Sequence, residues 1–209
     1  MSSVFNPGPT GFLPVNLLGG RVYSGATRSI PIVSGYAQNI GFGDLVTVAN
    51  TGTVARVDTA SGAKAAFALA PVGIFLGCRF TDPTLKYPLF DQNWASGTVA
   101  SDAVAVIVDD PDAIFEITLT NASGDRYTAS AATQSTVGNN IGYYQPATFV
   151  NAGGNSTVSA NFASVNTTNT LPFRVVSIVP ESVLPDGTFT RVQVIYNAAM
   201  HFYRQATGI

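Results

Sequence analysis

Hydrophobic and polar residues alternate along several short segments of this chain, and turn-forming residues separate these segments. Alternation with a period of two is typical of a β-strand that buries one face. We expect strands at residues 30–33, 44–48, 53–57, 71–80, 103–108, 114–120, 173–179 and 190–196, and the start of one at 141–144. Two sequences, 50–52 (Asn-Thr-Gly) and 185–187 (Pro-Asp-Gly), have the composition of hairpin turns. The pattern therefore predicts an all-β protein.

Helical patterns are nearly absent. Residues 60–70 are rich in alanine but contain Ser61-Gly62 and precede Pro71, so they fit either one helical turn or a loop. Residues 197–204 fit either a last strand or a short helix. We expect an antiparallel β-sandwich or barrel with long loops.

The first 20 residues differ from the rest of the chain. Prolines and glycines are dense there and exclude a helix. Phe5, Phe12 and Leu13 lie between them, so we expect an extended N-terminal arm (1–20) that docks on its own domain or on a neighbouring subunit. Residues 21–209 then form a single β domain. A stretch rich in Asn, Ser and Thr begins at about residue 121, so a second β-lobe from that point is an alternative to the single domain.

Charged residues are scarce in this chain. Charged residues make up 11% of the 209 residues, against about 25% in an average protein. The net charge of −2 excludes a nucleic-acid binder that works by neutralising phosphates. No apolar window is long enough for a membrane-spanning helix, and residues 1–10 do not resemble a signal peptide. Such a surface favours association, so we expect a protein that works inside an assembly.

Groups suited to catalysis are few. The chain has one histidine, His201, and one cysteine, Cys78, which cannot make a four-ligand zinc site. Cys78 lies in an apolar run and is expected to be a buried, inert thiol. His201 lies between Met200 and Phe202, so we expect it to pack or hydrogen-bond. No phosphate-binding or dinucleotide-binding motif occurs. We therefore expect a protein that is not an enzyme and needs no cofactor.

Four acidic residues, Asp109, Asp110, Asp112 and Glu116, form the one candidate chemical site. Carboxylates so close together can bind Ca²⁺ or act as a catalytic pair. The sequence Asp-Asp-Pro-Asp between two strands is also ordinary turn composition, because aspartate side chains cap backbone groups. The turn is the favoured interpretation, with a cation site second and catalysis last.

Residues 87–94 are dense in aromatic side chains, with Tyr87, Phe90 and Trp94. Three roles remain open for this loop. Trp94 could fill the core, anchor a subunit interface, or offer its face to a sugar ring.

Several segments together carry a resemblance to a known class of protein. They include Gly11-Phe12, Gly35-Tyr36-Ala37, Pro71-Val72-Gly73-Ile74-Phe75, Asp109-Asp110-Pro111 and Leu171-Pro172-Phe173-Arg174. The chain resembles, over nearly its whole length, virion structural proteins encoded among the head genes of tailed bacteriophages. The shared motifs are structural rather than catalytic.

The resemblance implies a cement or decoration protein. Such a protein is made in the bacterial cytoplasm and sits on the outer capsid surface, commonly as a homotrimer at local three-fold axes. Its partner is the major capsid protein, with no nucleic acid and no membrane involved. In this interpretation the contact residues are Phe5, Phe12, Leu13, Tyr87, Phe90 and Trp94. The alternatives are another virion part (tail, adaptor or head-fibre base) and a carbohydrate-binding module for attachment to the host.

Overall fold

The computed structural model describes residues 8–125, 133–183, 190–197, 199–206 and 208. These residues form strands and short 3-10 helices, and they contain no α-helix. The strands are β1 (Leu13–Leu17), β2 (Arg21–Val22), β3 (Arg28–Pro31), β4 (Leu45–Val48), β5 (Val54–Arg56), β6 (Gly62–Lys64), β7 (Gly73–Thr81), β8 (Pro88–Asp91), β9 (Val104–Val108), β10 (Ala113–Thr120), β11 (Asn140–Gln145), β12 (Ser159–Asn166), β13 (Phe173–Ile178) and β14 (Arg191–Tyr196). The 3-10 helices are η2 (Gln134–Thr136), η3 (Pro180–Ser182) and η4 (Phe202–Arg204). The expected all-β class is confirmed.

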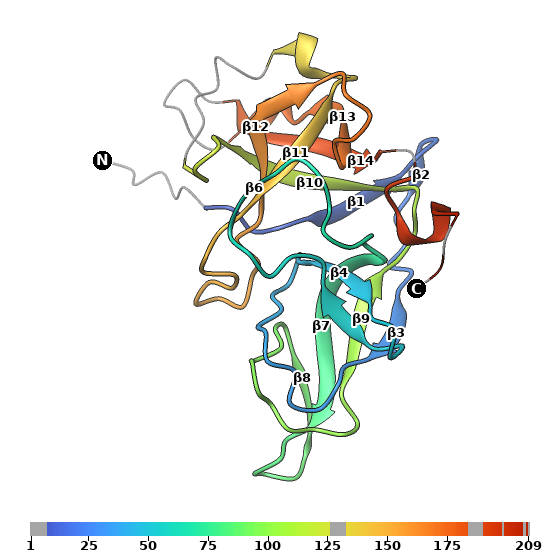
Figure 1. Ribbon diagram of the computed structural model, residues 1–209, viewed down its shortest axis with the longest axis vertical. Helices are drawn as coiled ribbons and strands as arrows, with labels where there is room; N and C mark the ends of the chain where they lie inside the picture. Colours follow the sequence, from blue (N-terminus) through green and yellow to red (C-terminus); the bar gives the residue numbers. More distant parts are fainter. Residues whose placement is uncertain (1–7, 126–132, 184–189, 198, 207, 209) are drawn as a thin grey trace.

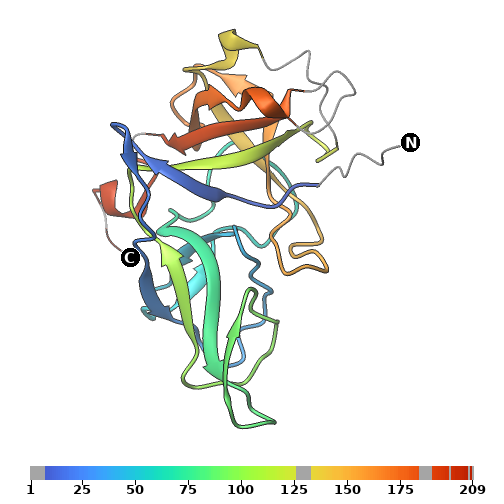
Figure 2. The ribbon, with the colours of Figure 1, turned by 180° about the vertical axis from the view of Figure 1, so that it is seen from behind.

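Two sheets lie one above the other, as Figures 1 and 2 show from opposite sides. The first runs in the order β12-β11-β13-β14-β10-β1-β2, with β6 paired to β11. Because β10 also pairs with β12, strands β10, β14, β13, β11 and β12 close into a small barrel. The second sheet runs β3-β9-β7-β4-β5, with β8 paired to β7. The strands from β10 onwards all belong to the first sheet, and the part of the chain before them supplies the whole second sheet together with β1, β2 and β6 of the first.

The buried hydrophobic residues form two clusters, and the first of them also takes in Leu45, Ile74 and Val108 from strands of the second sheet. In the first, aromatic rings fill the barrel: Phe173 contacts Phe12 and Tyr196 at centroid distances of 4.8 and 5.5 Å. The second core contains Trp94, Phe75 and the inward residues of β3 and β9. Antiparallel pairing of β4 with β5, and of β13 with β14, matches the two expected hairpins. The turn expected at 185–187 lies outside the described residues.

The described part of the expected N-terminal arm (1–20) packs on the rest of the chain. Within the described part of residues 1–20, β1 is a strand of the first sheet, antiparallel to both β10 and β2. The sequence hid this strand because Pro14 interrupts it. Pro14 is tolerated at the β1–β10 pairing because the register shifts beside it. Residues 60–70 also differ from expectation: they contain the short strand β6, which pairs with β11.

After β14 the chain crosses from the first sheet to the second. The N–H of Phe202 donates to the carbonyl of Pro71 (2.9 Å), and the Phe202 ring packs against the second core. The expected strand or short helix near the end is η4. The C-terminal segment (residues 200–205) therefore ties the two sheets together.

Candidate docking surface

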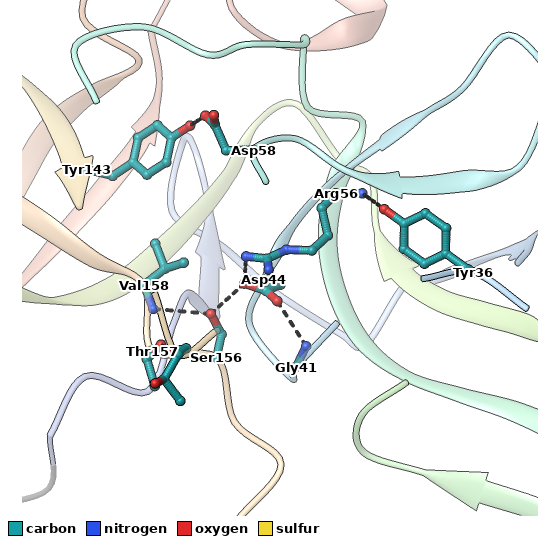
Figure 3. A network of polar contacts seen from close by, with 10 residues as sticks. Tyr36, Gly41, Asp44, Arg56, Asp58, Tyr143, Ser156, Thr157 and Val158 are labelled. Carbon is teal, nitrogen blue, oxygen red and sulfur yellow. Dashed lines mark hydrogen bonds and ion pairs between the residues drawn. The ribbon is translucent and has the colours of Figure 1, made fainter. Parts of the chain in front are cut away.

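Charged side chains meet where the two sheets join (Figure 3). The Arg56 guanidinium lies 3.5 Å from the Asp44 carboxylate, and each side chain is only 1% exposed. Asp44 also accepts hydrogen bonds from Ser156 Oγ (2.6 Å) and from the Gly41 N–H (2.9 Å). Burial raises the pKa of Asp44, and Arg56 opposes this shift by a smaller amount. The pair joins β4 and β5 to the loop before β12.

Neighbouring groups extend this buried cluster. The Arg56 guanidinium lies over the Phe149 ring, 3.8 Å from its centroid. Beside it, the Tyr143 hydroxyl donates a short hydrogen bond to Asp58, which pairs with Lys64 at 3.2 Å. Burial and the Asp58 carboxylate raise the pKa of Tyr143. The cluster joins the two sheets, and its Asp44 and Arg56 side chains are closed off from solvent.

The structure does not bring the acidic candidates together into a cation site. Asp109 pairs with Arg28 (2.7 Å), Glu116 with Arg191 (2.9 Å), and Asp112 with Arg204. Asp110 accepts from the N–H of Asp112 (2.8 Å), as a turn residue does. Among the described residues no group of three or more His, Cys, Asp or Glu side chains could hold a metal ion. Three of the four candidate carboxylates thus pair with arginines, and Asp110 bonds within the turn.

The thiol of Cys78 is buried and hard to deprotonate. Cys78 is buried within the second core, where its Sγ–H donates weakly to the Asn93 carbonyl (3.5 Å). Burial, with a smaller contribution from Asp91, raises the pKa of the thiol to about 12. The expected burial of this thiol is confirmed, and a thiolate nucleophile is disfavoured at neutral pH.

Two of the six expected contact residues are fully buried. Phe12 and Trp94 are both 0% exposed, so they belong to the cores and not to an interface. The Trp94 indole donates to the Tyr36 carbonyl (3.3 Å) and meets the Phe80 ring edge-on, which leaves no face for a sugar. Leu13 is half-buried in β1. Phe5 lies outside the described residues.

The remaining two contact residues, Tyr87 and Phe90, are exposed on the hairpin formed by β7 and β8. Phe90 is 77% exposed, Leu85 62% and Tyr87 46%. The hairpin reaches to the end of the molecule farthest from the barrel (Figure 1). Clustered large apolar side chains at such a place are typical of an interaction site.

The turn of this hairpin is held by one side chain. Asp82 Oδ1 accepts from the N–H groups of Thr84 and Leu85, both at 2.7 Å. The Asp82 backbone bonds to Tyr87 (2.9 Å) and Lys86 (3.0 Å). These bonds fix the backbone that carries Leu85 and Tyr87 before any partner arrives. Less conformational entropy is then lost on binding.

Phe90 stands between two surface hollows. One, of about 270 Å³, is lined by Arg79, Leu89 and Val104 among others. The other, of about 450 Å³, is lined by Phe42, Leu76 and Val106 among others. The outer side of β7, β8 and β9 is therefore uneven and largely apolar, with one aromatic ring projecting from it. We call Leu85, Tyr87, Phe90 and the two hollows the hairpin surface.

Sequence reasoning missed Leu85 and Arg79 in this surface. Leu85 carried a signal, because it is an apolar residue inside a turn composed of Asp, Pro, Thr and Lys. Arg79 carried one as well, as the charged residue in an otherwise apolar strand.

Comparison with protein-family models, with curated proteins and with solved structures finds no significant match to this chain. Within the described ranges, no helix is long and apolar enough to cross a membrane.

Proposed function

We propose that this chain is a non-enzymatic virion protein that binds the outer capsid surface of a tailed bacteriophage and stabilises the head. The observation that carries the proposal is the hairpin surface, where Phe90 is 77% exposed on a turn fixed by Asp82. The resemblance to phage head proteins supplies the capsid as partner and the homotrimer as the working form.

The interior supports a binding role over a catalytic one. The Asp44–Arg56 pair and the Cys78 thiol are closed to solvent, and the Asp109 and Asp112 carboxylates pair with arginines. A clamp needs rigidity, which the closed barrel and the buried ion pair provide. It also needs apolar contact area, which the hairpin surface provides.

Binding to the capsid becomes tighter when several copies of the hairpin surface bind at once. Burial of one large apolar side chain contributes about 1.5–3 kcal/mol, so one hairpin supports only modest affinity after the cost of association. In a trimer, three hairpins engage one shell, and the second and third contacts become intramolecular. We expect a solution mass of about 65 kDa for three chains of 21.7 kDa, measured by light scattering.

The first test uses heads assembled without this chain, to which the purified protein is added before co-sedimentation. Phe90→Ala should weaken binding roughly 30-fold or more, since a central aromatic anchor is worth about 2 kcal/mol or more. Val22→Ala is the matched control, because Val22 is 76% exposed but lies on β2 in the other sheet. We expect the control to bind like the wild-type chain.

Two results would argue against the proposal. If the wild-type chain does not sediment with the heads, capsid binding is wrong. If Phe90→Ala and Val22→Ala bind equally well, the hairpin surface is not the contact. Quantitative mass spectrometry of virions separates decoration from an adaptor or tail part, because decoration requires many copies in each particle.

A further inference from the structure

The hairpin surface has a charge as well as an apolar character. Arg79 on β7 lies directly opposite Phe90 on β8 and opposite Val104 on β9. Residues directly opposite in neighbouring strands share a face of the sheet. The exposed Arg79 therefore lies in a row between an aromatic and an aliphatic side chain, beside the 270 Å³ hollow that all three line.

The carboxylates of this region are engaged within the chain. Asp102 accepts from the Thr81 hydroxyl (2.6 Å) and from the Thr81 N–H, and these bonds lower its pKa. Asp82 accepts from two backbone N–H groups of the turn, and Asp91 accepts from the N–H of Asn93 (3.2 Å). Both oxygens of Asp102 and one oxygen each of Asp82 and Asp91 therefore accept hydrogen bonds from this region itself.

The cations of this region are different. Arg79 and Lys86 are both exposed, and neither forms an ion pair with any described carboxylate. By contrast, Arg28, Arg191 and Arg204 elsewhere in the chain are each paired. The hairpin surface thus presents open N–H donors beside exposed apolar groups.

We infer that the partner of the hairpin surface is a protein face that carries carboxylates among apolar side chains, with one carboxylate received by Arg79 beside Phe90. The inference rests on the proposed function and names the chemistry of the capsid face. Arginine suits this role because its planar guanidinium can bind a carboxylate through two parallel hydrogen bonds. Strand addition to β8 is disfavoured, because Pro88 has no N–H to offer at that edge.

The experiment measures binding of four purified chains to heads assembled without the protein: wild type, Arg79→Glu, Lys86→Glu and Arg21→Glu. Arg21 is the matched control, since it is exposed, forms no ion pair with a described carboxylate, and lies on β2 in the other sheet. We expect Arg79→Glu to bind roughly 30-fold or more weakly, because an unmatched charge in an interface costs about 2 kcal/mol or more. Lys86→Glu should weaken binding less, and Arg21→Glu should not.

A second arm tests the partner directly. Heads treated with a carbodiimide and glycinamide, which convert surface carboxylates to amides, should lose binding of the wild-type chain. Raising the salt concentration should weaken wild-type binding more than that of Arg79→Gln, because the variant has lost the ionic contact. Unchanged melting temperatures of the variants show that the fold is intact.

The outcomes distinguish the two proposals. Wild-type binding that survives both Arg79→Glu and amidation of the heads would overturn the carboxylate partner and leave capsid binding in place. If Phe90→Ala weakens binding but Arg79→Glu does not, the carboxylate partner is likewise overturned and capsid binding through the hairpin surface stands. Absence of binding by the wild-type chain would overturn both proposals.

Discussion

Replacing Asp44 with asparagine should destabilise the protein by about 3–5 kcal/mol, the usual cost of removing one partner of a buried ion pair. Asp44 is 0% exposed, and Asp44→Asn leaves the Arg56 guanidinium in the interior with no anion beside it. A guanidinium keeps its charge in proteins, so the variant cannot relieve the penalty by losing a proton. Urea denaturation at pH 7, followed by the fluorescence of Trp94, measures the free energy of unfolding.

The reverse substitution should cost less. Arg56→Met leaves the Asp44 carboxylate without its cation, but a carboxylate can take up a proton, and burial already raises the pKa of Asp44. Its bonds from Ser156 and Gly41 remain. We therefore expect a smaller loss for Arg56→Met than for Asp44→Asn.

The double variant Asp44→Asn/Arg56→Met is the control that isolates the pair. Without either charge, the methionine can pack beside Phe149, and the loss should fall below the sum of the single losses by about 2 kcal/mol. Strictly additive losses, or a loss below about 1 kcal/mol for Asp44→Asn, would show that the two charges are not coupled across the junction.

The sequence predicted most of the second sheet because its strands alternate or are uniformly apolar, as in β7 and β9. It missed β12 because small and polar side chains line that strand. Ser159 and Asn161 are buried there, although neither has the hydrophobic character that marks a strand. The barrel closes through β12, so its closure was not visible from periodicity.

The candidate site was predicted in part for similar reasons. Exposure of Tyr87 and Phe90 agrees with their suggested contact role, whereas Phe12 and Trp94 pack inside. An aromatic residue in a loop has the same sequence pattern whether it faces solvent or the core, so composition could not separate them. Arg56 did carry a signal, because it shares the inward positions of its strand with buried Val54. Ser156, which donates to the Asp44 carboxylate, lies 112 residues from Asp44 in sequence, so this contact could not be inferred.

Acid should weaken the fold through the one histidine of the chain. His201 is 0% exposed, and burial lowers its pKa from 6.5 to about 4. Between these values the unfolded chain binds a proton that the folded chain does not, so stability falls as the pH falls from 6.5 towards 4. A shift of this size corresponds to at most about 3 kcal/mol. Urea denaturation at pH 7 and at pH 4.5 measures the loss.

His201→Phe should remove this loss, because phenylalanine keeps the ring between Tyr196 and Tyr203, which lie 4.9 and 5.2 Å away by centroid. The variant is less stable at pH 7, since Tyr203 loses the ring nitrogen to which its N–H donates (3.3 Å). Its free energy of unfolding should nevertheless change less between pH 7 and pH 4.5 than that of the wild type. Protonation of Asp44, whose pKa is raised in the fold, increases stability as the pH falls, and it does so in both proteins. Only the difference in pH dependence between the two proteins therefore reports on His201. Equal pH dependence in the two proteins would mean that His201 takes up a proton as easily in the folded state as in the unfolded state, and that protonation does not loosen the C-terminal segment.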